Sequence, residues 1–242
     1  MEKQPKYNFD LKKEQIREIF NTPDYQEYKE KKKKNQKRRE NIYQFTSIGN
    51  STNIVKTLII INVLIFICEL LVPSIVTQFA CYNISDPNFA LYQPLTCMFL
   101  HGSFLHILFN MIVLWQFGNQ LEILIGKSKF LFLYFATGIF SSILVMLFSS
   151  SPAVGASGAL CGLLASYIFI APETTVLLFF VIPMKIKNLI YGFMIFSFVF
   201  GILSIINPSY GFGIAHFGHL GGLISGYLIT YYWKTKNLIE TD

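Results

Sequence analysis

The stretch from Gly155 to Ser166, which reads Gly-Ala-Ser-Gly-Ala-Leu-Cys-Gly-Leu-Leu-Ala-Ser, places a serine at the start of an otherwise apolar segment. Small residues recur in it every four positions, at Gly158, Gly162 and Ser166. This spacing lets two helix backbones approach closely in lipid. Because hydrocarbon leaves unpaired hydrogen-bonding groups unsatisfied, a polar side chain in such a segment is read first as part of a functional site. The stretch therefore predicts a closely packed membrane helix with Ser157 at its entrance.

A second stretch has small residues in the same register, at Gly218, Gly222 and Gly226, and His219 follows the first of them. If the two glycine rows face each other, Ser157 and His219 come within about 2.6–3.2 Å, as an activated nucleophile requires. Helix packing alone explains the glycines but not the serine and histidine beside them. We therefore predict Ser157 as a nucleophile and His219 as its general base.

The composition predicts an all-α membrane protein. Of 242 residues, 52% are hydrophobic and only 14% are charged. Crossing a bilayer takes about 20 helical residues, and six apolar stretches reach or approach this length. They are Ile54–Leu71, Phe104–Leu121, Phe130–Ser149, Ser157–Ala171, Ile186–Ile206 and Phe212–Trp233. The fourth is short, as expected if its outer end opens into a water-filled cavity.

The basic residues predict how these spans are oriented. The loops 72–103, 150–156 and 207–211 contain no lysine or arginine, whereas the other connections and both termini do. Lys56 and Lys187 lie just inside the first and fifth spans, where they can snorkel to the surface. The positive-inside rule then predicts cytoplasmic termini and three external loops.

The same distribution predicts three parts. Residues 1–53 form a basic cytoplasmic tail, residues 54–233 a six-span domain, and residues 234–242 a short cytoplasmic tail. The lysine run 31–34 is interpreted first as a solvated face, and second as a contact with anionic lipid headgroups. Nucleic acid is not an expected partner, because the run lacks interleaved aromatic residues.

Two further polar residues lie on the first turns of the second span. His106 and Asn110 are four positions apart and therefore share a helix face. Asn110 alone is consistent with helix association, and His106 alone with capping of a helix end. Together they supply donors suited to a developing oxyanion. With Ser157 and His219, they are predicted to lie in the outer part of the bilayer.

The remaining polar residues leave alternatives. His216, one turn before His219, is the rival base, and the glycine row beside His219 favours the latter. His101 is expected to brace the approaching loop by hydrogen bonding. Glu69 at the outer end of the first span is more consistent with snorkelling to the interface than with orienting a histidine. A two-residue serine–histidine site is therefore favoured over a triad.

Three motifs in order resemble the rhomboid family of intramembrane serine proteases, over about residues 54–233. They are His101-Gly102 through His106-x-x-x-Asn110, Gly155-Ala156-Ser157-Gly158, and Gly218-His219-x-x-Gly222-x-x-x-Gly226. The resemblance implies six helices around a cavity open to the outside, with Ser157 as nucleophile and His219 as base. It also implies an oxyanion site built from His106, Asn110 and the backbone N–H of Ser157. Substrates in the family are single-spanning membrane proteins, and no metal or cofactor is used.

The chain departs from that family at two places. Many relatives have an aromatic residue four places after the serine, packed on the histidine ring, where this chain has Cys161. A frequent Trp-Arg pair of the outer loop is replaced by Tyr92-Gln93. The four cysteines show no metal-ligand spacing.

Two other functions compete with proteolysis. A catalytically silent scaffold of the same fold would bind client membrane helices without cutting them, although such relatives usually lack the serine or the histidine. A transporter or channel would extend polar residues into the inner halves of the spans, and these halves are nearly all apolar. The sequence predicts a protease over both, and it indicates no oligomeric state.

Overall fold

A computed structural model of the chain describes residues 20–33, 53–149, 151–178, 182–211 and 214–239. The chain divides into two units, residues 1–50 and 51–242. In the first unit, residues 23–33 are helical and almost entirely exposed. Lys31 and Glu27, one turn apart on this helix, form an ion pair at 2.8 Å. Most of the predicted tail lies outside the described residues.

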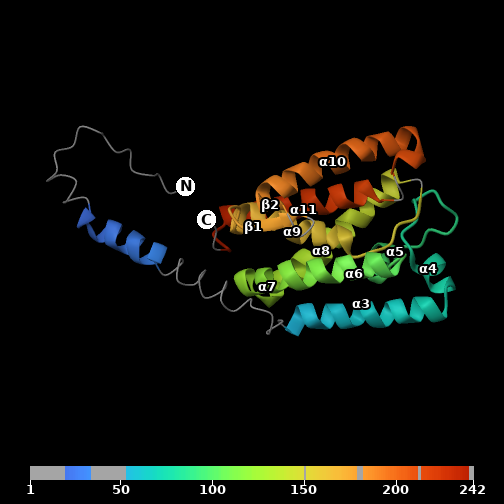
Figure 1. Cartoon of the computed structure of the whole chain (residues 1–242), viewed down its shortest axis with the longest axis horizontal. Coiled ribbons are helices and arrows are strands. Elements are labelled where there is room, and N and C mark those ends of the chain that lie inside the picture. The colour runs from blue at the N-terminus through green and yellow to red at the C-terminus, as the bar shows by residue number, and fades with distance from the viewer. Residues whose placement is uncertain (1–19, 34–52, 150, 179–181, 212–213, 240–242) are drawn as a thin grey trace. The chain divides into compact units, whose positions relative to one another are not determined.

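A helix occupies each of the six apolar segments of the second unit, and the long axes of these helices run in a common direction (Figure 1). The helices are α3 (Asn53–Leu71), α6 (Phe104–Val113) continuing into α7 (Asn119–Ile125), α8 (Lys127–Phe148), α9 (Ser157–Ile170), α10 (Ile186–Ile206) and α11 (His216–Thr235). Among the described residues, four helices are long and apolar enough to cross a membrane: α3, α6 with α7, α8 and α10. The number of six spans stays a prediction.

Helix α9 is the buried helix of the bundle. Ten of its fourteen residues are buried, and it packs against α8 and α11. A helix that is apolar all round is stable where neighbours cover every face. Because protein and not lipid surrounds α9, it does not need the length of a full span.

The glycine rows of α9 and α11 face each other, which confirms that prediction. A Cβ atom on Gly222 would lie 2.0 Å from the carbonyl oxygen of Gly158, and one on Gly226 would lie 2.2 Å from that of Gly162. Helix α8 fills the other side of the α9 glycines, which the sequence did not predict. A Cβ on Gly158 would meet Ser141 Oγ at 2.0 Å.

The second span is longer than predicted because a π-helical turn, η2 (Leu114–Gly118), joins α6 to α7. Only Gly126 separates α7 from α8, so residues 122–129, which connect the second and third predicted spans, are helical except at this glycine. Gly126 has φ +84°, a backbone conformation that glycine adopts without steric strain, and α7 ends at the residue before it. Buried Glu122 of α7 accepts the N–H of Val55 at 3.3 Å, in the first turn of α3.

The 72–103 segment contains α4 (Ser74–Phe79), α5 (Gln93–Thr96) and the 3₁₀ turn η1 (Cys97–Phe99). This segment forms backbone hydrogen bonds with the residues that precede Ser157. Cys81 and Ala153 exchange two backbone hydrogen bonds of 2.9 Å, and the N–H of Gly155 donates to the carbonyl of Cys97 at 2.9 Å. The predicted outer loop therefore fixes the entrance of α9.

Gln93, from the pair that departs from the family pattern, is a brace within this segment. Its side chain is 1% exposed. Its amide nitrogen donates to the carbonyls of Asn88 at 2.8 Å and Gln78 at 3.3 Å, and its oxygen accepts from the N–H of Ala90 at 3.1 Å. One buried amide thus satisfies three backbone groups of the loop.

The expectation of an all-helical chain needs one correction. The strands β1 (Thr175–Leu178) and β2 (Ile182–Lys185) form an antiparallel pair in which Val176 lies opposite Met184. Glu173, just before β1, pairs with Lys187 at the start of α10. The hairpin with this ion pair connects α9 to α10.

The last span begins later than predicted. After the 3₁₀ turn η3 (Pro208–Gly211), α11 begins at His216, four residues beyond Phe212. His219 therefore lies in the first turn of its helix, as Ser157 does in α9.

Candidate active site

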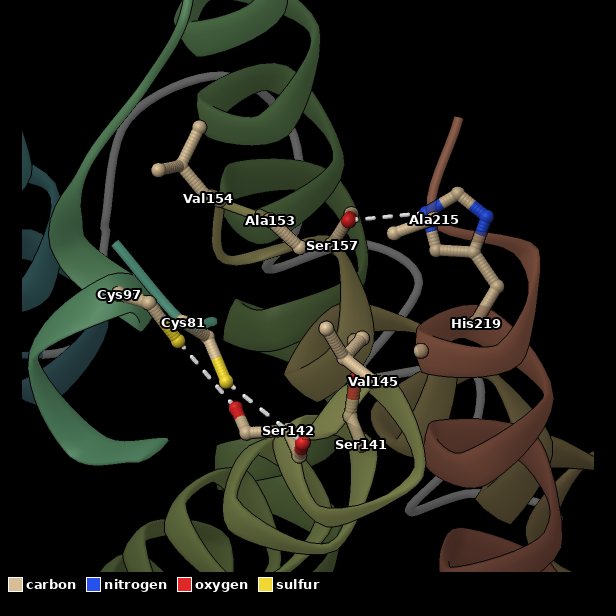
Figure 2. Close-up of a pocket in the computed structure, with 13 residues that line it drawn as sticks. Cys81, Cys97, Ser141, Ser142, Val145, Ala153, Val154, Ser157, Ala215 and His219 are labelled. Atoms are coloured by element: carbon tan, nitrogen blue, oxygen red, sulfur yellow. Dashed lines mark hydrogen bonds between the residues drawn. The ribbon is translucent and has the colours of Figure 1, made fainter. Parts of the chain in front are cut away.

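Ser157 and His219 come from different helices and meet between them (Figure 2). The Nε2 atom of His219 lies 2.9 Å from Ser157 Oγ. Both residues are half-buried. Their approach follows from the glycine contacts, because Gly158 directly follows the serine and Gly222 lies one turn beyond the histidine. The distance lies within the range in which a base accepts a proton from a nucleophile.

The helix start leaves a donor next to this pair. Ser157 is the first residue of α9, and the first four N–H groups of a helix have no acceptor inside it. The preceding Gly155 has φ +122°, which an L side chain rarely adopts. The sharp turn at Gly155 brings the chain from the 72–103 segment into α9 with the serine at its first position.

His106 and Asn110 lie beside the same turn. A Cβ atom on Gly155 would lie 2.8 Å from His106 Nε2 and 3.7 Å from Asn110 Nδ2. Asn110 is 6% exposed, and its Nδ2 has no acceptor among the described residues. Leaving a buried amide donor unpaired is unfavourable. The Asn110 Nδ2 group is therefore available to donate a hydrogen bond. The structure thus brings both predicted donors to the turn at Gly155, directly before Ser157.

The rival base His216 is directed elsewhere. Its Nε2 atom lies 3.1 Å from the carbonyl oxygen of Gly211, and its ring packs against Phe196 and Phe200 at centroid distances of 5.5 and 5.7 Å. Between the two histidines of α11, His219 is the one that contacts the serine hydroxyl.

Glu69 and His101 interact in a way that the sequence did not predict. The Glu69 carboxylate accepts the backbone N–H of His101 at 3.2 and 3.1 Å, whereas neither ring nitrogen of His101 has a hydrogen-bond partner among the described residues. The loop brace is therefore made by the backbone of His101. Its buried ring packs edge-on against His106 at 5.2 Å. Burial lowers the pKa of His101 to about 4, with a smaller contribution from His106, so His101 is neutral at neutral pH.

A small pocket opens beside Ser157 and His219, and both residues line it. The lining residues that were not predicted include two cysteines and two serines: Cys81, Cys97, Ser141 and Ser142. Cys97 Sγ lies 3.3 Å from Ser142 Oγ, and Cys81 Sγ donates to the Ser142 carbonyl at 3.6 Å. The adjacent serines within an apolar span were the signal that could have identified this wall of the pocket. All four cysteines of the chain are free thiols.

Within the ranges that the structure describes, no three His, Cys, Asp or Glu side chains lie together as metal ligands would.

Comparison with known proteins gives a consistent family. The family model described as the Rhomboid domain matches residues 88–236. The chain is 34% identical over 139 residues to the rhomboid protease GluP of Bacillus subtilis (strain 168), an overlap of 56% of this chain and 25% of that protein. It is 33% identical over 160 residues to the rhomboid protease GlpG of Yersinia pestis (strain Pestoides F), an overlap of 66% of this chain and 54% of that protein. The GlpG of Yersinia pseudotuberculosis serotype I (strain IP32953) gives the same values.

The chain therefore spans between a quarter and about half of the length of the curated relatives it matches. The matched family model covers more than half of the 242 residues and includes His106, Asn110, Ser157 and His219. Four apolar helices in the described part of the chain are each able to cross a membrane. The chain belongs to the rhomboid family of integral membrane proteins.

Proposed function

We propose that this chain is an intramembrane serine endopeptidase that cleaves transmembrane segments of single-spanning membrane proteins with a Ser157–His219 dyad. The observation that carries the proposal is the 2.9 Å contact between Ser157 Oγ and His219 Nε2, made by residues of two different helices. The names of the relatives, rhomboid proteases, support the same activity.

The proposed reaction is acyl transfer to the serine followed by hydrolysis. Ser157 Oγ bonds to the carbonyl carbon of the scissile peptide while its proton passes to His219 Nε2. The carbon–nitrogen bond then breaks and the leaving amine takes that proton. Water attacks the resulting ester, with His219 accepting the water proton and returning it to Ser157. Proton transfer of this kind typically contributes 10²–10⁴-fold to the rate.

The negative charge that develops on the carbonyl oxygen needs donors that are already in place. We assign this role to the Asn110 amide, the His106 ring and the N–H of Ser157. The unpartnered Nδ2 of Asn110 supports the assignment, because a donor that bonds nothing in the resting enzyme is available to the transition state.

Asn110→Ala is expected to lower kcat by about 10²–10³-fold, the usual effect of removing one oxyanion donor, without a comparable change in KM. The matched control is Asn119→Ala, which removes an equally buried amide from the continuation of the same helix. Asn119 Nδ2 donates to the Trp115 carbonyl at 2.7 Å, within its own helix. Steady-state cleavage of a tagged membrane substrate measures both variants. Equal losses in the two would contradict the assignment to Asn110.

We further propose six spans, cytoplasmic termini and an active site toward the exoplasmic side, with residues 1–53 and 234–242 as the two tails. The absence of lysine and arginine from 72–103, 150–156 and 207–211 supports this orientation. A site near the outer surface gives water access to the acyl-enzyme.

The decisive experiment for the activity needs no known substrate. Purified wild-type protein in detergent is treated with a fluorophosphonate probe, and the modified residue is identified by peptide mass spectrometry. We expect covalent labelling at Ser157, loss of labelling after heat denaturation, and none at Ser157 in His219→Ala. Folded wild-type protein that remains unlabelled would favour the scaffold that binds client helices without cutting them.

A further inference from the structure

The ring of His219 packs against an aromatic residue that no motif indicated. Phe193, on α10, has its ring centroid 5.4 Å from that of His219, with an angle of 39° between the ring planes. Cys161, four positions after the serine, lies instead in the interface of α9 and α11. Its Cβ is 3.1 Å from the place where a Cβ on Gly222 would stand. The aromatic packing on the histidine is thus supplied from a different helix.

Phe193 belongs to a row of phenylalanines on one face of α10. Phe196 and Phe200 follow at helical spacing, with ring centroids 6.4 Å apart between Phe193 and Phe196 and 4.5 Å between Phe196 and Phe200. Phe196 and Phe200 both pack on His216. The row therefore meets the two histidines of α11 in order, with Phe193 at His219.

Little else holds the His219 ring in its orientation. Its Nδ1 atom is buried and has no hydrogen-bond partner among the described residues. Nε2 bonds Ser157, which is the group it has to serve. In a triad, a carboxylate bonded to the far nitrogen would fix the ring. Here the rotation about the Cβ–ring bond is limited by packing.

We propose that Phe193 is a positioning residue for His219, which holds the imidazole so that Nε2 faces Ser157. It replaces the aromatic residue that many relatives have at the position of Cys161. The inference rests on the proposed serine–histidine activity. Phe193 does not touch the reacting atoms, and it acts through the base. Because it stands on α10, the base is aligned only when α10 packs against α11.

Little of α10 is buried, so the half-buried ring of Phe193 differs from the exposed side chains on the same helix. Only 17% of its spanning residues are buried, and Phe198, between the residues of the row, is 55% exposed. Phe193 is half-buried against α11. Replacing Phe198 therefore removes the same side chain from the same helix without touching His219, and it provides the matched control.

The test compares Phe193→Ala, Phe193→Tyr and Phe198→Ala with the wild type. For each protein, kcat and KM are measured with a membrane substrate, and the rate of fluorophosphonate labelling at Ser157 is measured separately. An aromatic pair contributes enough to make Phe193→Ala lose about three- to tenfold in kcat and in labelling rate, with KM unchanged. Phe193→Tyr keeps the ring and is expected to match the wild type, as is Phe198→Ala.

Several outcomes would overturn the role of Phe193: an unchanged kcat in folded Phe193→Ala, a change confined to KM, or a Phe193→Tyr variant no better than alanine. If Phe193→Ala does not fold, Phe193→Leu replaces it and is expected to lose activity in the same direction, because it retains bulk without a flat ring. Labelling of the wild type at Ser157 tests the dyad separately. If Ser157 of the folded wild type is not labelled, the dyad is refuted. If the wild type and Phe193→Ala are labelled at the same rate, only the positioning role of Phe193 is refuted.

Discussion

Ser157→Ala and His219→Ala are each expected to lower cleavage by at least about 10⁴-fold, and the double variant is expected to lose no more than either single one. The reason is that nucleophile and base act as a unit, so removing one member leaves the other without a role. Their 2.9 Å contact is the geometry on which this depends. Initial rates on a tagged single-spanning substrate in liposomes, with equal amounts of folded enzyme, measure the effect.

His216→Gln is the control for this pair. It changes the other histidine of α11 and keeps a side-chain donor for the Gly211 carbonyl that His216 contacts at 3.1 Å. Its cleavage rate per folded molecule is expected to stay within about threefold of the wild type, a change of roughly 0.6 kcal/mol in the activation barrier, because the His216 ring bonds the Gly211 carbonyl and not the serine hydroxyl. If His216→Gln were as inactive as His219→Ala, or if purified Ser157→Ala still cleaved, the proposed dyad would be wrong.

The candidate site could be proposed from the sequence because membrane chemistry restricts where polar groups occur. Ser157, His219, His106 and Asn110 interrupt apolar segments, and each interruption requires a partner or a function. The glycine rows then identified the helices that touch, and the contacts of Gly222 and Gly226 with the α9 backbone confirm it. Both signals are local patterns, so they can be read without a structure.

Two contacts of the candidate site join segments that are distant in the sequence, and no local sequence pattern indicates them. The second side of Gly158 is filled by Ser141 of α8, which the spacing on α9 alone does not reveal, because any neighbour with small side chains would fit. The interaction of Phe193 with His219 was missed because four phenylalanines cluster between positions 193 and 200 of α10 and the sequence does not single out one of them. The sequence of an apolar span does not distinguish a phenylalanine that faces lipid from one that faces the protein.

The ends of the elements were predicted least well, for identifiable reasons. The second and third helices extend beyond their predicted ends until only Gly126 separates them, because a single glycine with positive φ suffices to end one helix and begin the next. The hairpin of β1 and β2 lies in a short connection where neither alternation nor turn residues gave a clear signal. None of these errors moves Ser157 or His219, since their helices are fixed by the glycine contacts.

Gly222→Val is expected to lower cleavage by at least about 10³-fold while the six helices remain formed. A Cβ atom at this position would stand 2.0 Å from the carbonyl oxygen of Gly158. Since backbone atoms cannot yield as a side chain does, α11 and α9 must separate by roughly 1 Å or more. A displacement of that size next to reacting groups typically costs about 10²-fold, and the two methyl groups of valine increase it.

Two further glycine variants separate alignment from packing. Gly226→Ala meets the Gly162 carbonyl at 2.2 Å, one turn further from the site, so it is expected to lower the thermal stability, as Gly222→Val does, but to retain more activity per folded molecule. Gly192→Ala on α10 has no atom within 4 Å of the new Cβ, and alanine favours a helix over glycine by about 1 kcal/mol. It should therefore keep full activity, with an unchanged or higher melting temperature. Activity that followed melting temperature alone across the three variants would mean that the glycines stabilise the bundle without aligning Ser157 and His219.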